Sequence, residues 1–215
     1  SISTARLLNA LLDVSELEVG AIKPRFEIFS ANNILISIFQ SFLPLAKDKG
    51  LNFRVVPSSL YVRSDPALLE RILGNFMSNA IRYTDKGSVL IGCRKRGDKV
   101  VIEVWDTGCG ISDDQMSLIY EDFYQVENKE RDRGKGLGLG LALAKRLADS
   151  LEHSINSKST LGAGSCFSVA VDIAENKADK NLDDGFMNIM NLSGVNVFLV
   201  EDDMDVLKAT KQLLE

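Results

Sequence analysis

Three short motifs constrain the fold and function of this chain more than any other feature. The run Asp106–Ile111 (DTGCGI) is preceded by Asn75–Asn79 (NFMSN) and followed by Gly136–Gly140 (GLGLG). A carboxylate on a tight glycine turn can accept the exocyclic amine of a purine. Asparagines four residues apart lie on one helix face and can offer oxygens to a hard cation, and a glycine-rich loop that opens a helix presents backbone N–H groups to phosphate. Each motif alone is a weak signal, but this order within one domain's length predicts an ATP site.

Composition limits the class of protein. The chain has 215 residues, 45% of them hydrophobic, which suits one globular domain with additional segments. Its net charge of −5 and pI of about 5.1 disfavour a nucleic-acid-binding protein, which usually has a basic face. No apolar run approaches the roughly 18–20 residues that span a bilayer, no signal peptide opens the chain, and Cys93, Cys109 and Cys166 lack a paired or metal-binding spacing. These features predict a cytoplasmic chain that binds no nucleic acid.

Apolar periodicity and turn residues predict alternating helices and strands. Asp65-Pro66 begins one helix, because Asp is a favoured N-cap and Pro is tolerated at the first helical position. Val89–Arg94 and Val100–Val104 form a predicted hairpin around Gly97-Asp98, and its second strand leads to Asp106. The other predicted helices are 3–19, 31–48, 113–120 and 139–151, and the second of these is expected to be interrupted or bent near Pro44. The other predicted strands are 26–29, 51–56, 61–63, 154–157 and 165–171. A polar loop is predicted at 126–135.

Each motif also has an ordinary structural interpretation. Asn75 and Asn79 would suit any polar helix face. Asn is unfavourable inside a helix, however, so two of them one turn apart favour a functional role. Asp106 would suit a solvated turn, but it follows a valine-rich strand that brings it to the end of a buried element. The leucines within 136–140 distinguish that motif from a flexible linker, and it matches neither the P-loop nor a GxGxxG that follows a strand.

A few other side chains are candidates for a role. Arg82 and Tyr83 lie one turn beyond the second asparagine and are candidates for phosphate and ribose contacts. Cys109 is interpreted as a small packing residue, because no base is placed to activate it. His153, the only histidine, is interpreted as a structural residue.

The motifs together resemble the ATP-binding catalytic domain of sensor histidine kinases. The matching segments, in order over residues 25–173, are the N box (Asn75…Asn79), the first glycine box (Asp106–Gly110), the F box (Phe123–Gln125), the second glycine box (Gly136–Gly140) and the last glycine-containing motif (Gly162–Ser165). Leu11–Gly20 resembles the end of the second dimerisation helix of the same family, and Val197–Asp203 resembles the first strand and acidic pair of a receiver domain. The chain is therefore identified as resembling part of a hybrid histidine kinase.

The resemblance implies a fold and a domain organisation. The fold is an α/β (α+β) two-layer sandwich, with a mixed sheet packed on helices, shared with DNA gyrase and the heat-shock chaperone ATPases and called the Bergerat fold. The implied segments are 1–22 from the dimerisation helix, 23–173 as the ATP-binding catalytic domain, 174–194 as a linker and 195–215 as the start of a receiver domain. ATP would lie between helices under a lid at roughly 121–137.

The resemblance also implies which residues bind the nucleotide and Mg²⁺. The implied contacts are Asn75, Asn79, Arg82, Tyr83, Asp106, Gly108, Gly110, Ile111, Phe123, Lys135, Gly136, Leu137, Gly138, Leu139 and Ser165. In this set Asn79 holds Mg²⁺, Asp106 binds adenine N6 partly through water, and Gly136 and Gly138 donate backbone N–H groups to phosphate. Asn75 assists the metal or phosphate contacts.

The sequence departs from the family at three points. Arg82 stands where the family usually has Lys, which retains the charge on a wider, forked group, and Lys135 stands where many members have Thr or Gly. The family's phosphoacceptor His, in a His-Glu-x-Arg-Thr-Pro-like context, has no counterpart, and His153 does not match it.

These departures shape the expected function. The expectation is an ATP-binding domain that transfers phosphate to a His on a separate dimerisation domain. Its parent is expected to be a homodimer that works with a receiver domain or response regulator, and this chain is expected to be the cytosolic portion whether or not the parent is anchored in a membrane. The alternatives are another ATPase of the same fold, such as a gyrase-like or chaperone-like enzyme, and a degenerate nucleotide-binding interaction module.

Overall fold

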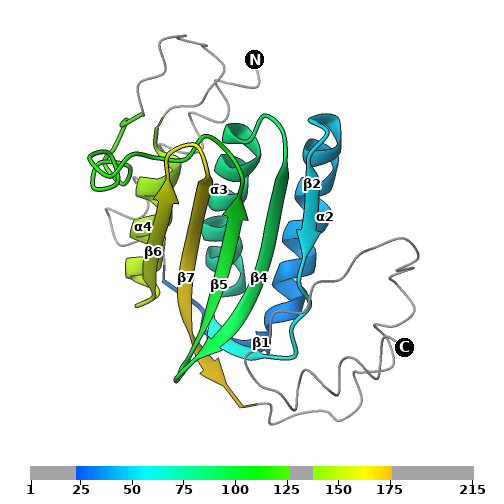
Figure 1. Cartoon of the computed structure of the whole chain (residues 1–215). Coiled ribbons are helices and arrows are strands. Elements are labelled where there is room, and N and C mark those ends of the chain that lie inside the picture. Colours follow the sequence, from blue (N-terminus) through cyan, green and yellow to red (C-terminus); the bar gives the residue numbers. More distant parts are fainter. Residues whose placement is uncertain (1–22, 126–137, 176–215) are drawn as a thin grey trace, which may run out of the picture. The chain divides into compact units, whose positions relative to one another are not determined.

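A mixed sheet forms one layer of the molecule (Figure 1). The computed structural model describes residues 23–125 and 138–175. The seven strands run in the order β1 (Glu27–Ser30), β3 (Tyr61–Ser64), β7 (Gly164–Ala174), β5 (Lys99–Asp106), β4 (Ser88–Arg96) and β2 (Asn52–Val55), and β6 (Ser154–Thr160) also pairs with β7. β2 and β4 are parallel, and the other strand pairs in this part of the chain are antiparallel, so the sheet is mixed as predicted.

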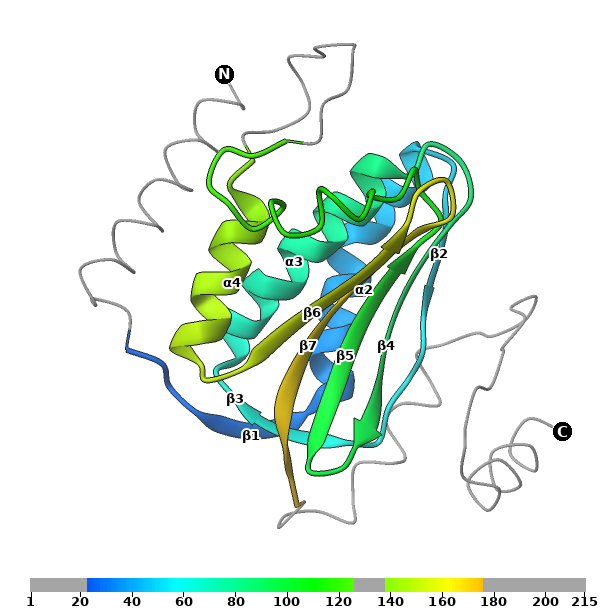
Figure 2. The same cartoon turned by 60° about the vertical axis from the view of Figure 1, so that its left-hand side comes forward.

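Three helices form the second layer and cover one face of the sheet (Figure 2). They are α2 (Ala31–Asp48), α3 (Pro66–Tyr83) and α4 (Gly140–Ser150). Their apolar sides pack on the sheet through a core that includes Leu35, Ile72, Phe76, Leu147, Ile91, Ile102 and Val169. In the part of the chain that the structure describes, none of the helices has the length and apolarity required to cross a membrane.

Strand register decides which side chains face the helices. Along β5, Val100, Ile102 and Val104 are fully buried on the helix side, whereas Glu103 and Trp105 belong to the alternate set. Asp106 has the same parity as the buried valines, so it reaches the end of β5 on the helix side. The two consecutive residues at the end of this strand therefore face opposite sides of the sheet.

Two predicted elements differ from the structure. α2 continues through Pro44, so of the predicted interruption or bend the interruption is wrong; Pro44 lies on the exposed side, where water can bond the carbonyl that the missing N–H leaves free. Residues 113–120 form a run of turns instead of the predicted helix, with backbone bonds such as Leu118 N–H to Gln115 O (2.9 Å). The predicted helix at 3–19, the loop at 126–135 and the receiver-like segment at 195–215 lie outside the described residues.

Helix α3 begins at a carboxylate that holds two backbone groups. Asp65 is buried; its Oδ1 accepts the Leu68 N–H (3.1 Å), which caps the helix, and its Oδ2 accepts the Arg25 N–H (2.7 Å). One side chain thus fixes both the start of α3 and the segment that enters β1.

Replacing Asp65 by Ala is expected to lower the free energy of unfolding by about 1–2 kcal/mol, because both N–H groups lose their acceptor. The urea midpoint of the chain measures this loss. Asp65→Asn keeps a good N-cap and should lose less, and Ser30→Ala, which removes only the 3.3 Å cap bond of α2, is the matched control. An Asp65→Ala loss no larger than that of Ser30→Ala would contradict the double role.

Candidate functional site

The candidate site is centred on a buried carboxylate at the end of β5. Asp106 is only 9% exposed, and its Oδ1 accepts the Gly108 N–H at 2.8 Å. Burial raises the pKa of the Asp106 carboxyl, and the backbone N–H groups of Gly108 and Ser165 partly oppose this rise. The solvated-turn interpretation is therefore wrong: Asp106 is an enclosed acceptor whose charge is stabilised by only a few donors.

The glycine turn after Asp106 lies directly against the end of α3. The Cys109 N–H donates to the Tyr83 carbonyl at 3.3 Å, and a Cβ on Gly108 would overlap that same carbonyl oxygen. Gly110 adopts φ +68°, and a Cβ there would overlap the Thr160 carbonyl. Larger residues at these two positions would push the turn away from α3 and from the β6–β7 turn.

The two asparagines of α3 are half-buried and one turn apart. Asn75 Nδ2 donates to the Arg71 carbonyl at 2.9 Å, and its Oδ1 lies beside Gly140, where a Cβ would be 2.9 Å away. The Asn79 side chain has no hydrogen-bond partner within residues 23–125 and 138–175. Asn75 Oδ1 thus lies at the contact between α3 and the start of α4, and none of the described residues bonds the Asn79 amide oxygen.

The start of α4 presents uncapped backbone N–H groups near Asn75. Its N-cap, Leu139, makes no side-chain cap bond, and the first turn has no acidic residue. Gly138 precedes it in a left-handed conformation and packs on the backbone of Phe123 and Tyr124. An uncapped helix N-terminus favours an anion through its free N–H groups and the helix dipole.

Two residues that support the site were not predicted from the sequence. Lys49 Nζ donates to the carbonyls of Ile81 (2.8 Å) and Arg82 (2.7 Å) at the end of α3. Ser159 Oγ accepts the Ile111 N–H at 2.8 Å and lies 2.9 Å from Ser165 Oγ, which joins the glycine turn to β7. Neither residue has a local sequence signal for this role, because the α3 carbonyls are more than thirty positions from Lys49 and Ile111 is 48 positions from Ser159.

The structure gathers most of the predicted site residues. Asn75, Asn79, Arg82 and Tyr83 lie on α3, Asp106, Gly108, Gly110 and Ile111 form the turn beside it, Ser165 pairs with Asp106 on β7, and Gly138 and Leu139 lead into α4. Phe123 contributes its backbone beside Gly138, while its residue is 63% exposed at φ +62°. Lys135, Gly136 and Leu137 lie outside the described residues, as does most of the predicted lid.

A family comparison decides what this arrangement is. Residues 64–175, about half of the chain, match the family model described as the histidine kinase-, DNA gyrase B-, and HSP90-like ATPase. The chain belongs to this ATPase family. The match begins at the end of β3 and runs to the end of β7, so it includes every described residue of the predicted site, whereas the supporting Lys49 precedes it.

Curated proteins that are similar to this chain include sensor proteins. The sensor protein TorS of Escherichia coli (strain K12) is 29% identical over 222 residues, covering 99% of this chain and 23% of that protein. The autoinducer 2 sensor kinase/phosphatase LuxQ of Vibrio cholerae serotype O1 is 32% identical over 174 residues, covering 78% of this chain and 20% of that protein. The chain therefore spans about a fifth of the length of these curated relatives.

A solved structure agrees with the sequence relatives. Full-length ShkA in complex with AMPPNP superposes with a TM-score of 0.71 at 28% identity, over 80% of this chain and 36% of that chain. This likeness confirms the predicted α/β sandwich. Its agreement with the sequence relatives supports the assignment of the chain to this ATPase family.

The three cysteines of this ATPase domain are expected to differ in reactivity. Cys109 is exposed in the glycine turn, whereas burial raises the pKa of the Cys166 thiol to about 12 and also raises the pKa of Cys93. At mildly alkaline pH, iodoacetamide should label Cys109 first, and ATP should slow that labelling because the turn borders the proposed base site. A labelling time course read by peptide mass spectrometry measures the order, with Cys109→Ser as control. Faster labelling of Cys166, or no protection by ATP, would contradict this geometry.

Proposed function

We propose that this chain is the catalytic part of a hybrid sensor histidine kinase that transfers the γ-phosphoryl group of ATP to a His on a separate dimerisation domain. The observation that carries the proposal is the enclosed Asp106 carboxylate, which lies where β5, β7 and the end of α3 meet. A fixed, buried acceptor of this kind suits the exocyclic amine of adenine and discriminates strongly against a base that lacks it.

The polar groups around Asp106 fit the rest of the nucleotide. The uncapped start of α4 and the charged Arg82 would bind the phosphates, and Tyr83 at the end of α3 would lie near the ribose. Lys49 would hold the end of α3 in place while these contacts form.

The donor set also fits Mg²⁺ better than a metal held wholly by protein. In the described ranges no group of three or more His, Cys, Asp or Glu side chains is suited to a metal ion. Asn79 would supply one oxygen, and phosphates and water would supply the others, which is how Mg²⁺ is commonly bound. Bound there, Mg²⁺ would neutralise charge on the phosphates.

The phosphoacceptor must come from another domain. His153 is buried, its Nε2 lies 2.8 Å from Ser64 Oγ, and burial lowers the pKa of its imidazole. This enclosed ring follows the end of α4, whereas the uncapped N–H groups are at the start of that helix. In the proposed reaction a nitrogen of the acceptor His bonds to the γ-phosphorus, the bond from that phosphorus to the β–γ bridging oxygen breaks, and ADP leaves. The residues of this chain hold the substrate in position and shield its charge. The parent is proposed to be a homodimer whose receiver domain takes the phosphate next.

A transfer assay tests the proposal. The chain is mixed with the separately expressed dimerisation domain of the same protein, Mg²⁺ and γ-labelled ATP, and acid-labile label on the dimerisation domain is measured. Label should appear on that domain, and it should disappear when its His is replaced by Gln or when Asp106→Asn is used. ATP hydrolysis without transfer would favour another ATPase of the same fold, and the absence of nucleotide binding would favour a degenerate interaction module; either result overturns the proposal.

A further inference from the structure

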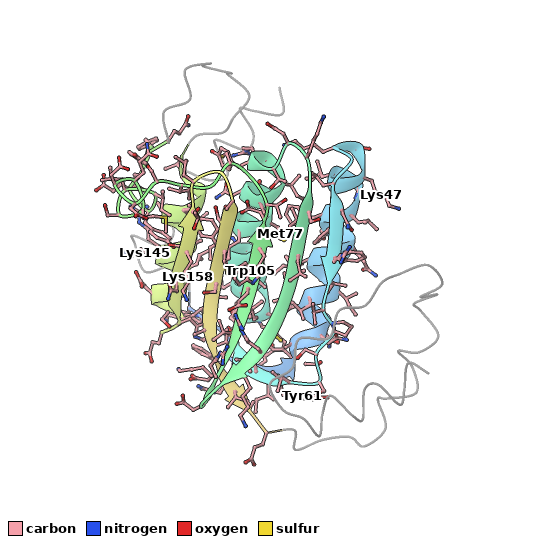
Figure 3. The ribbon with its side chains drawn as sticks, in the orientation of Figure 1. Lys47, Tyr61, Met77, Trp105, Lys145 and Lys158 are labelled. Atoms are coloured by element: carbon pink, nitrogen blue, oxygen red, sulfur yellow. The ribbon has the colours of Figure 1, made fainter. Side chains whose placement is uncertain are left out.

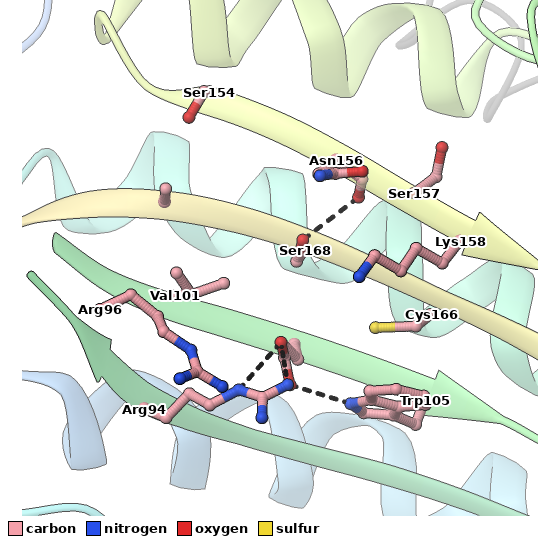
Figure 4. Close-up of a pocket in the computed structure, with 12 residues that line it drawn as sticks. Arg94, Arg96, Val101, Trp105, Ser154, Asn156, Ser157, Lys158, Cys166 and Ser168 are labelled. Carbon is pink, nitrogen blue, oxygen red and sulfur yellow. Dashed lines mark hydrogen bonds and ion pairs between the residues drawn. The ribbon is translucent and has the colours of Figure 1, made fainter.

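The sheet face opposite the helices carries a hollow of about 290 Å³ lined by residues of β4, β5, β6 and β7 (Figure 4). Within the described ranges, all three helices lie on the other side of the sheet and leave this face uncovered (Figures 1 and 2). Trp105, the only tryptophan in the chain, lies in it and is 43% exposed. Trp105 is the second-last residue of β5, so its large ring provides contact area near one end of this open face.

The tryptophan is held in position by an ionic network. Glu103 accepts two short bonds from Arg94 Nη2 (2.6 and 2.7 Å) and one from Trp105 Nε1 (3.0 Å). The indole N–H is therefore satisfied within the sheet, which leaves the apolar ring as a preformed surface. Cys166 on β7 pairs with Trp105 and provides a small side chain beside it.

The hollow is cationic although the chain is acidic. Its lining contains Arg94, Arg96 and Lys158 but only one carboxylate, Glu103, whereas the whole chain has a net charge of −5. Lys158 extends from β6 on the same side of the sheet as Trp105 (Figure 4). Opposite charge steers and orients a partner, and like charge repels one.

We propose that this open face docks an acidic segment of a partner protein, with an apolar side chain against Trp105 and carboxylates beside Arg94, Arg96 and Lys158. Trp and Arg are the residues that most often carry binding energy in protein interfaces. A second copy of the same face is disfavoured because it would bring cations against cations. A nucleic acid is disfavoured by the acidic chain as a whole.

The surface is separate from the nucleotide site. Trp105 and Asp106 are consecutive on β5 and face opposite sides of the sheet. A docked segment therefore leaves the Asp106 side open, and the inference stands whether or not the phosphotransfer proposal is correct. A variant of this surface that still binds nucleotide is therefore shown to be folded.

The size of the face indicates a transient contact. β4 has 9 residues and is about 30 Å long, and four strands are about 19 Å wide, so the footprint is on the order of 600 Å². This is below the roughly 800 Å² per partner of a standard stable interface. Micromolar affinity is therefore expected.

The single tryptophan makes the test direct. The full chain is titrated with a synthetic peptide in which Glu and Asp flank a Leu-Phe pair, and Trp105 emission is recorded. A saturable blue shift with micromolar affinity is expected, and high salt should weaken it. The same peptide with every Glu and Asp replaced by Gln and Asn should bind at least tenfold more weakly.

Matched variants locate the contact. The double variant Arg96→Glu, Lys158→Glu should weaken the acidic peptide at least tenfold. The control pair Lys47→Glu, Lys145→Glu changes charge equally on the helix layer (Figure 3) and should leave the affinity unchanged. Trp105→Ala, followed with a fluorescent peptide, should weaken binding similarly, with nucleotide affinity retained in every variant.

Four outcomes overturn the proposal. They are no saturable response, equal binding of the Gln and Asn peptide, equal loss in the helix-layer control pair, and tighter binding of oligo(dT) than of the acidic peptide. The last outcome would assign the face to single-stranded nucleic acid.

Discussion

Replacing Asp106 by Asn is expected to weaken ATP binding by about tenfold to a hundredfold, or about 1.4–2.7 kcal/mol. Asn has the same shape, so its oxygen can still accept the Gly108 N–H that now bonds Oδ1 at 2.8 Å. The other carboxylate oxygen becomes an amide N–H₂, which meets the exocyclic amine of adenine donor to donor. Because the residue is enclosed, no water can readily repair the mismatch.

The same substitution is expected to leave the protein equally or more stable at neutral pH. Burial raises the folded-state pKa of Asp106 above its unfolded value. Such a group contributes its stability below the unfolded pKa and loses that contribution as pH rises through the folded pKa. The wild-type carboxyl should therefore oppose folding more at about pH 7 than at about pH 4. ATP affinity should show the opposite trend and fall on acidification, starting above the usual range of an Asp.

Titration calorimetry with ATP, and urea unfolding at both pH values, measure these effects. Asp48→Asn, which removes an exposed carboxylate at the end of α2, is the control and should change neither quantity. Near-normal ATP binding by a folded Asp106→Asn protein would show that another group recognises the base.

Asn79→Ala is expected to remove the enhancement of ATP binding by Mg²⁺, which we expect to be at least tenfold. Asn79 is half-buried, and none of the described residues bonds its side chain, so its oxygen is the protein ligand that the geometry leaves open. Mg²⁺ requires a strict set of oxygen ligands and is shared with the phosphates, so losing one protein oxygen affects ATP and not the base. Adenosine affinity should therefore change little.

Parallel titrations with ATP and adenosine, each with Mg²⁺ and with EDTA, separate the two effects. Asn33→Ala, at an exposed position of α2, is the matched control. A mutant that keeps the full Mg²⁺ enhancement would place the ion on another residue. Equal losses for ATP and adenosine would mean that Asn79 supports the helix and holds no metal.

Elements with strong local signals were predicted closely. α2 has the predicted bounds, and α3 begins at the predicted N-cap because Asp65 and Pro66 act within one turn of their own positions. The hairpin of β4 and β5 turns at Gly97-Asp98 as predicted, since the turn residues and the alternating strands are adjacent in the chain. The turns at 113–120 were missed because a helix and a run of turns share short-range backbone bonds, so the local sequence does not distinguish them.

The sequence by itself determined which residues are chemically equipped to bind a nucleotide: a carboxylate before two glycines, two asparagines on one helix face, and a glycine-rich helix start. Only the tertiary structure decided that the Tyr83 carbonyl holds the glycine turn, that Lys49 holds the end of α3, and that Trp105 faces an open side of the sheet. The first two of these features are contacts between residues far apart in the chain, and the third is the orientation of a strand residue. They depend on strand order and on which face the helices cover, and local propensity specifies neither.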